Sequence, residues 1–395
     1  MEYIEINGRS VNSWCDNVDT KTLEQIGNLC QLPFLYHHLA VMPDAHAGMG
    51  MPIGGVLATV DAVVPNAVGV DIGCGMCAMK SDIRCENLSR KDLMALVNDI
   101  KRRIPTGYDW HDEAQDECHM PQGFDISSLH VIRGQYPNAC RQVGTLGGGN
   151  HFIELQCDDE GFLWVMIHTG SRNLGKQVGE YYNKIAQRLN AAYHSVVSDE
   201  LDLAFLPLRT LEFKAYWDEM TYCIAFARCN RQLIISRIRE CISNRYPRTH
   251  FADPIDIAHN YAAWERHYGN SVIVHRKGAV RAMKGEIGII PGSQGTCSYI
   301  TEGLGNPRSF TSSSHGAGRI MSRNRAKHTL DLDAEIARMN AQGIIHDMHS
   351  IHDLDEAAGA YKDIDQVMAS QTDLVKIKTR LRPIAVIKGS NEHKK

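Results

Sequence analysis

The sequence lacks the features that define several whole classes of protein. No apolar run in its 395 residues approaches the about 20 residues that a membrane-spanning helix needs. Residues 1–10 contain neither a basic start nor the apolar segment of a secretory signal. We therefore expect no membrane association and a cytoplasmic location.

Disulfide scaffolding and a strong net charge are also missing. The 12 cysteines are scattered and are not spaced as in small disulfide-linked domains, which is typical of free thiols in a reducing compartment. Acidic residues slightly outnumber basic ones, 46 to 42, and the net charge is −4. If the partner is a nucleic acid, its binding surface must be a local positive patch, because the overall field does not attract phosphate.

The chain has no internal repeat and no low-complexity linker, and its expected strands and helices do not alternate in a βαβ rhythm. This pattern predicts an α+β fold in which mixed β-sheets form a central core with helices around it. We expect one continuous catalytic domain over residues 1–395, with a helical lobe at about 176–250. The expected strands are 54–60, 151–156, 163–168, 271–274 and 383–387, and the expected helices are 89–103, 176–194, 208–243 and 332–342.

One short segment, "VGVDIGCGMCA" at 68–78, combines residue types that suit a metal ion. It opens like a buried strand from Val68 to Ile72, and two glycines then flank Cys74, three residues after Asp71. A carboxylate and a thiol on a glycine-bent loop can both turn toward one point, and a transition metal is the commonest ligand for such a pair.

Four histidines stand where an expected strand or loop meets a glycine-rich or polar segment: His151, His168, His259 and His315. Any one of them alone is more often a partly buried histidine with satisfied hydrogen bonds. Four in similar contexts are harder to explain in that way. Together with Asp71 and Cys74 they form a donor set suited to Mn²⁺, Zn²⁺ or Fe²⁺.

Other candidate sites are weaker. Cys74 and Cys77 form a C-x-x-C pair, but a thioredoxin-like pair opens a helix, and no helix is expected here. His346, His349 and His352 lie in a polar, acidic segment that favours a solvated surface. The loops "GTLGGGN" and "PGSQGT" offer backbone N–H groups to phosphate, yet neither matches a P-loop or a Rossmann fingerprint.

The longer motifs resemble the RtcB family of GTP-dependent RNA ligases. The resemblance runs in consistent order from about residue 33 to residue 389. It rests on "PDAHAGMGMPIGG", "VGVDIGCG", "GTLGGGNHFIEL", "HTGSRNLG", "HNY", "RKGAV", "IIPGSQGTCSYI", "SHGAGRIMSR", "AYKDID" and "VIKG".

The resemblance implies that the protein joins RNA 3′-phosphate or 2′,3′-cyclic phosphate ends to 5′-hydroxyl ends with GTP and two Mn²⁺ ions, in RNA repair or tRNA splicing. In that scheme a histidine is guanylylated, GMP moves to the RNA 3′-phosphate, and the 5′-hydroxyl displaces it. The implied partners are broken tRNA or rRNA and an archease-like activator, and the implied oligomeric state is a monomer.

Carried over to this sequence, the resemblance implies that Cys74 bridges two metal ions, one held also by Asp71 and His151 and the other by His168 and His259. His315 would be the guanylylated nucleophile. Arg172 and Arg319 would contact RNA or phosphate. The implied GTP or GMP site comprises Asn150, His151, Phe152, Glu154, Ser293, Ser298, His315, Gly316, Ala317, Gly318, Tyr361 and Lys388.

Two positions depart from the family pattern and suggest a divergent bacterial paralogue. Ala258 precedes His259 where many relatives carry a second histidine, and Met49 stands where relatives commonly carry a lysine. Two other functions stay open at this point. A di-metal phosphoesterase acting on RNA termini would share the metal residues and need no guanylate pocket, and a catalytically silent RNA-binding protein would need neither.

Overall fold

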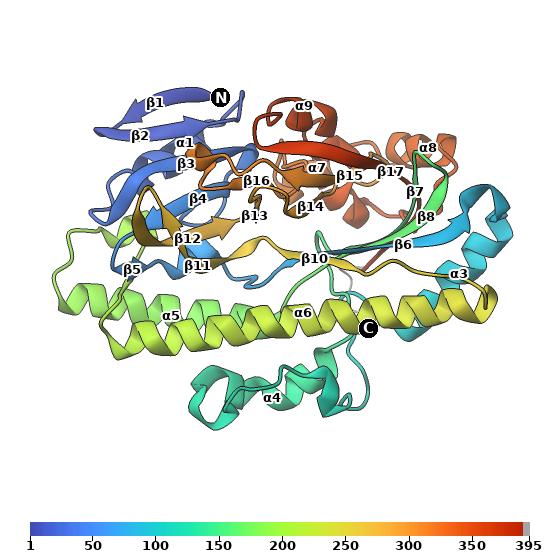
Figure 1. Cartoon of the computed structure of the whole chain (residues 1–395), viewed down its shortest axis with the longest axis horizontal. Coiled ribbons are helices and arrows are strands. Elements are labelled where there is room, and N and C mark those ends of the chain that lie inside the picture. The colour runs from blue at the N-terminus through green and yellow to red at the C-terminus, as the bar shows by residue number, and fades with distance from the viewer. Residues whose placement is uncertain (390–395) are drawn as a thin grey trace.

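Two β-sheets form the centre of the protein, and the computed structural model describes residues 1–389 (Figure 1). The first sheet has six strands in the order β1-β2-β3-β4-β12-β11. It is mixed, because β2 and β3 pair in parallel while the other neighbours are antiparallel. Its strands are β1 (Glu2–Ile6), β2 (Arg9–Ser13), β3 (Leu35–His46), β4 (Ile53–Thr59), β11 (Asn260–His267) and β12 (Asn270–Lys277).

The second sheet has seven antiparallel strands in the order β10-β6-β8-β7-β17-β15-β14. Every residue of β7 is buried, including the polar side chains of Glu154, Gln156 and Asp158. The strands are β6 (Gly75–Arg84), β7 (Phe152–Asp158), β8 (Phe162–Thr169), β10 (Ile255–Ala258), β14 (Ile287–Ile290), β15 (Ser298–Gly303) and β17 (Val375–Lys388). Two short ladders join β5 (Ala62–Val63) to β9 (Leu206–Pro207) and β13 (Ala279–Arg281) to β16 (Ser312–Ser314).

The long helices α5 and α6 run side by side below the sheets, and α4 lies on their outer side (Figure 1). Within residues 1–389, no helix combines the length and the apolarity that crossing a bilayer requires. The helices are α1 (Thr20–Leu29), α2 (Pro65–Val68), α3 (Arg90–Arg103), α4 (His130–Gln142), α5 (Arg172–Ala192), α6 (Leu211–Arg245), α7 (Arg323–Thr329), α8 (Leu332–Ala341) and α9 (Ile364–Ala369).

Helix α6 connects two parts of the hydrophobic core. Its first half buries Tyr216 and Phe226 against α4 and α5. Its second half buries Ile234 and Ile238 against α3 and the strands β7 and β8. The 35 residues of α6 therefore pass beneath the end of β8, where the side chains of the candidate site gather.

The α+β fold class is confirmed, as are the expected helices and strands. α3 begins after Ser89, whose hydroxyl and Asp92 form a capping box. α5 begins at Arg172, four residues before the expected start, and the expected strand 383–387 is the end of the longer β17. The single catalytic domain and its helical lobe at about 176–250 stay predictions.

The strand expected to open at Val68 is wrong. Val68 ends the short helix α2, the following residues form a loop, and β6 begins only at Gly75. Pro65 at the first turn favours the helix. Gly69 and Gly73 then adopt φ of +90° and +76°, left-handed values that bend the chain away from a regular strand. The apolar residues of this segment are thus buried in a loop.

Candidate active site

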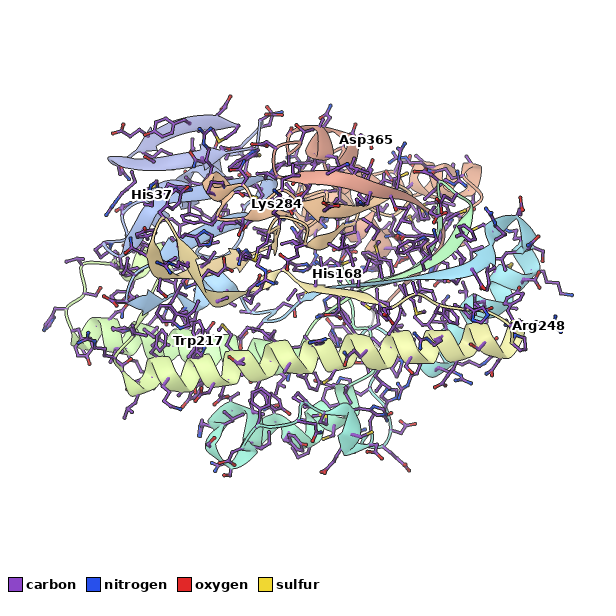
Figure 2. The ribbon with its side chains drawn as sticks, viewed as in Figure 1. His37, His168, Trp217, Arg248, Lys284 and Asp365 are labelled. Carbon is purple, nitrogen blue, oxygen red and sulfur yellow. The ribbon has the colours of Figure 1, made fainter. Side chains whose placement is uncertain are left out.

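Five side chains predicted as metal ligands lie together in the centre of the molecule, where Figure 2 labels His168. The Sγ atom of Cys74 lies 3.4 Å from Nε2 of His151 and 3.3 Å from Nε2 of His168. Potential ligand atoms of Asp71, Cys74 and His151 lie within 4.8 Å of one another, and so do those of Cys74, His168 and His259. Cys74 belongs to both groups, as a bridging ligand would.

The imidazole rings are oriented so that Nε2 faces the cluster. Nδ1 of His168 lies 3.1 Å from the carbonyl oxygen of Asn150, and Nδ1 of His151 lies 3.1 Å from that of Leu146. A ring that donates its Nδ1–H to a carbonyl keeps a lone pair on Nε2, which is the usual arrangement of a metal-bound histidine. Nε2 atoms of His168 and His259 lie only 3.3 Å apart. A cation between these acceptors would relieve their repulsion.

The protonation states also fit a metal centre. Burial raises the pKa of the Cys74 thiol well above its usual range, and the Asp71 carboxylate raises it further. Burial lowers the pKa of His168 and His259 well below the usual value. Burial alone would raise the pKa of Asp71, but the hydrogen bond with His151 holds it at about 2. At neutral pH the cluster thus offers a carboxylate, neutral imidazoles and a thiol that needs a cation to ionise.

Two side chains of α6 support the loops that carry these ligands. The Asn230 amide donates to the carbonyl oxygens of Thr145 and Gly170 and accepts from the N–H of Gly144. The Arg231 guanidinium donates to the carbonyl oxygen of Gly73. It also forms an ion pair with Asp256 at 2.8 Å, and both Asn230 and Arg231 are fully buried. The sequence did not point to either residue, because both lie inside an apolar helical pattern.

The glycine-rich loop before β7 leaves room for Arg172. A Cβ atom at Gly147, where φ is +90°, would lie 2.1 Å from the Arg172 guanidinium. Arg172 donates through Nε to Thr145 Oγ1 at 3.3 Å, and its Nη1 lies 3.0 Å from His151 Nδ1. A metal ion at Nε2 of His151 would select the tautomer with hydrogen on Nδ1, which the Leu146 carbonyl accepts. Arg172 thus packs beside the metal cluster.

His315, the predicted nucleophile, is held by a carboxylate that the sequence did not identify. Asp44 is fully buried, and its Oδ2 accepts from Nδ1 of His315 at 2.6 Å. The same oxygen accepts from the backbone N–H groups of His315 at 3.1 Å and Gly316 at 3.2 Å. Because Nδ1 is engaged, Nε2 is the nitrogen free to react. The His315 ring lies 4.9 Å from that of His259, so the nucleophile stands beside the metal cluster.

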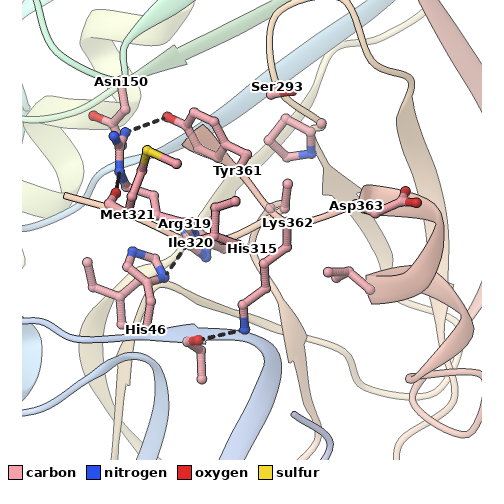
Figure 3. Close-up of a pocket in the computed structure, with 18 of the residues that line it drawn as sticks. His46, Asn150, Ser293, His315, Arg319, Ile320, Met321, Tyr361, Lys362 and Asp363 are labelled. Atoms are coloured by element: carbon pink, nitrogen blue, oxygen red, sulfur yellow. Dashed lines mark hydrogen bonds between the residues drawn. The ribbon is translucent and has the colours of Figure 1, made fainter. Parts of the chain in front are cut away.

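A cavity of about 910 Å³ opens in front of His315 (Figure 3). Ser298 and His151, although predicted to contact the nucleotide, do not line it. Ser298 is buried behind the wall, where its Oγ accepts from the N–H of Gly292 at 3.3 Å. The predicted nucleotide or phosphate residues in the cavity wall are Asn150, Phe152, Glu154, Ser293, His315, Gly316, Ala317, Gly318, Arg319, Tyr361 and Lys388.

Glu356 is a further residue of the cavity that the sequence did not indicate. Its carboxylate is 2% exposed, forms an ion pair with Arg323 at 2.9 Å and lies 4.0 Å from the Lys388 ammonium. It also accepts from the Tyr361 hydroxyl and pairs with Arg319 at 3.3 Å. Glu356 therefore holds four polar side chains of the cavity in place.

The C-x-x-C pair and the histidine segment form no metal-binding group in the described part of the chain. Cys77 lies in β6 opposite Ile167 and packs in the hydrophobic core. His349 and His352 are exposed, and no metal-binding group among residues 1–389 includes them. The solvated interpretation of this histidine segment fits the structure.

Comparison with known proteins identifies the family. The sequence model of the family described as "tRNA-splicing ligase RtcB" matches residues 25–389. The chain is 36% identical to "RNA-splicing ligase RtcB" of Escherichia coli K12, over 98% of this chain and 99% of the relative. It is 32% identical to "tRNA-splicing ligase RtcB" of Thermococcus kodakarensis, over 93% and 91% of the two chains. It is also 32% identical to "RNA-splicing ligase RtcB" of Mycobacterium tuberculosis, over 92% and 100%. The chain therefore belongs to the RtcB family of RNA-splicing ligases.

Proposed function

We propose that this chain joins RNA 3′-phosphate or 2′,3′-cyclic phosphate ends to 5′-hydroxyl ends, using GTP and two Mn²⁺ ions, in RNA repair or tRNA splicing. The observation that carries the proposal is the position of His315. This histidine faces a large cavity, is oriented by the Asp44 carboxylate, and stands 4.9 Å from the ring of a candidate metal ligand. A covalent nucleotidyl transfer needs these three features together.

The metal ions would be held by the two groups that share Cys74. Asp71 and His151 complete one group, and His168 and His259 complete the other. A pair of divalent ions neutralises charge on transferring phosphoryl groups. The carboxylate and the neutral imidazoles suit Mn²⁺, and Cys74 would supply a thiolate to both sites.

His315 would attack the α-phosphorus of GTP through Nε2. A phosphorus–nitrogen bond forms, the bond to the β-phosphate oxygen breaks, and pyrophosphate leaves. Asp44 holds the proton on Nδ1 and stabilises the positive charge that the ring acquires during the attack. An oxygen of the RNA 3′-phosphate then takes the GMP group from His315, and the RNA 5′-hydroxyl finally displaces GMP from that phosphate.

The guanine would lie at the end of the cavity that contains Glu154, Ser293 and Lys388. Glu154 is 3% exposed, and its carboxylate suits the adjacent N–H groups of a guanine edge. Burial raises the pKa of Glu154 to about 7, although the hydrogen bond from Gln156 and the nearby Lys388 oppose the shift. Asn150 and Tyr361, which also line the cavity, would contact the ribose or the phosphate.

The two departures from the family pattern leave this machinery intact. Ala258 ends β10 directly before His259, so it removes one potential polar contact without moving the ligand. Met49 is 52% exposed, and the buried Lys277 ammonium donates to its carbonyl oxygen. Lys277 thus supplies a cation near the loop where relatives carry one. We expect the departures to change substrate range or rate and to leave the reaction class unchanged.

Arg172 and Arg319 would contact RNA or its terminal phosphate, since Arg172 lies beside the metal cluster and Arg319 lines the cavity. The proposal includes broken tRNA or rRNA as substrate, action as a monomeric single-domain enzyme in the cytoplasm, and activation by an archease-like protein. These finer points rest on the family resemblance alone.

A joining assay tests the proposal. Two labelled RNAs, one ending in a 3′-phosphate and the other beginning with a 5′-hydroxyl, are incubated with the protein, GTP and Mn²⁺. We expect a joined product from the parent and from a His194→Ala control, which changes an exposed histidine outside the cavity, and none from His315→Ala. Release of 3′-phosphate without joining, independent of GTP, would instead support the phosphoesterase alternative.

A further inference from the structure

A fully buried glutamine lies directly behind Glu154, a residue of the cavity wall. Glu154 and Gln156 alternate with Leu155 on β7, so both side chains lie on the same face of the strand. Gln156 is fully buried, and its Nε2 donates to Glu154 Oε2 at 2.6 Å. This is a short hydrogen bond to a carboxylate at the wall of the cavity.

The second N–H of Gln156 connects the Glu154 carboxylate to the loop that begins at Gly292. Nε2 donates to Ser298 Oγ at 3.1 Å, and Ser298 Oγ in turn accepts from the N–H of Gly292. Gly292 opens the loop that places Ser293 in the cavity. Through Ser298, Gln156 therefore connects the strand that carries Glu154 to the loop that carries Ser293.

The Gln156 amide presents its nitrogen to Glu154 and Ser298. Both N–H groups meet acceptors, while Oε1 is buried and, within residues 1–389, has no hydrogen-bond partner. Leaving a buried carbonyl unpaired costs on the order of 1–3 kcal/mol. A flipped amide would instead place its oxygen against the Glu154 carboxylate. The Gln156 side chain therefore donates a hydrogen bond to Glu154 while its own Oε1 stays unpaired.

We propose that Gln156 is a positioning residue that keeps Glu154 an ionised acceptor and so determines the preference of the site for guanine over adenine. The inference rests on the proposed function, because it assumes that a purine nucleotide occupies this cavity. Guanine offers two neighbouring N–H donors to an ionised carboxylate, whereas adenine offers one amino group beside an acceptor nitrogen. A protonated Glu154 would lose this discrimination, because a carboxylic acid donates as well as accepts.

Few other charges act on Glu154. β17 places the Lys388 ammonium near it, and β8 places the uncharged Met166 opposite it in the sheet. The loop beyond Gly292 contributes Ser293, which is uncharged. Burial raises the pKa of Glu154 to about 7, so removal of one donor moves its ionisation through the physiological range.

The test measures equilibrium binding of GTP and ATP by calorimetry between pH 6 and 8.5 in about half-unit steps. The Mn²⁺-loaded protein carries His315→Ala, so that no adduct forms. The ratio of the two affinities at each pH removes the titration of the triphosphate, which both nucleotides share. Gln156→Met has a similar volume and no amide donor. Gln142→Met, at a buried glutamine in α4 outside the cavity wall, is the control.

We expect the parent and the control to prefer GTP with a common pH midpoint. In Gln156→Met the preference falls about fivefold at pH 7 and recovers at higher pH, because the midpoint rises by about one unit when the donor is lost. Gln156→Glu should move the midpoint in the same direction, because a second carboxylate repels the charge on Glu154. Gln156→Glu also keeps the proposal testable if Gln156→Met does not fold.

Two negative outcomes are distinguishable. If the parent does not prefer GTP at any pH, the proposed function fails and this inference fails with it. If the parent prefers GTP and the Gln156 variants keep both its preference and its pH midpoint, Gln156 is only a packing residue. The function proposed above would then stand without it.

Discussion

Replacement of Asp44 by asparagine tests the proposed activation of the nucleophile. In the parent, Oδ2 of Asp44 accepts three hydrogen bonds, from Nδ1 of His315 at 2.6 Å and from the N–H groups of His315 and Gly316 at 3.1 and 3.2 Å. Asp44→Asn keeps the shape of the side chain and removes its charge. The ring then acquires positive charge during attack without a buried counter-ion.

The magnitude follows from the bond to Nδ1. A hydrogen bond to a charged group contributes about 1.5–3 kcal/mol. Because 1.4 kcal/mol corresponds to a tenfold change in rate, we expect Asp44→Asn to slow formation of the protein–GMP adduct by about 10- to 100-fold. The affinity for GTP should stay near that of the parent, because Asp44 is fully buried and does not line the cavity.

The assay is the initial rate of label transfer from α-labelled GTP to the protein over a range of GTP concentrations, with Asp112→Asn at an exposed aspartate as the control. RNA that already carries a 3′-linked GMP should be sealed at nearly the parental rate, because that step no longer needs the nucleophile. An adduct rate within twofold of the parent, with His315→Ala inactive, would refute the role given to Asp44.

Three further predictions concern the metals, the nucleotide and pH. Cys74→Ser should lose both metal ions, because an alcohol is a poorer ligand than a thiolate, and two tightly held ions in metal analysis would refute the bridging role. Lys388→Ala should lower adduct yield about tenfold at subsaturating GTP, since a hydrogen bond to a charged group has that magnitude. Deletion of residues 390–395, which lie outside the described residues, should leave the yield unchanged. Equal yields from Lys388→Ala and the parent would refute the role of Lys388. Burial alone would raise the pKa of Glu265, but hydrogen bonds from His267 and Arg276 hold it at about 2. This stabilisation is present at pH values above the usual pKa of a glutamate and is lost as the pH falls toward 2. Chemical unfolding should therefore show Glu265→Gln to be about 3 kcal/mol less stable than the parent near pH 6 and equally stable near pH 2.

Local sequence could predict the site residues that stand beside recognisable strand ends and glycine-rich loops. His151 and His168 stand at the ends of β7 and β8, beside glycine-rich loops, and Cys74 and Asp71 share one such loop. Strand ends beside glycines present side chains to a site whatever the rest of the fold does. These candidate ligands are therefore predictable from local sequence alone.

The supporting residues could not be predicted, because distant parts of the chain bring them to the site. Asp44 meets His315 across 271 positions of sequence, and Asn230 meets Thr145 across 85. Asp44 also lies in β3, where Pro43 and three histidines obscure the strand pattern. No local sequence pattern predicts contacts between such distant residues, so only the tertiary structure reveals them.

The same limit explains the wrong strand at Val68. Its apolar residues match a strand, because a buried strand and a buried loop give the same short apolar pattern. Gly69 and Gly73 were visible in the sequence, but only the structure gives their positive φ values. The loop that they create is what turns Asp71 and Cys74 toward the histidines.

Mass spectrometry of the protein after incubation with GTP and Mn²⁺ tests the central claim most directly. The account predicts one GMP bound through an acid-labile bond to the peptide that contains His315, and no such adduct in His315→Ala. A parent protein that joins RNA without a GMP adduct, or that carries GMP on another residue, would contradict the account.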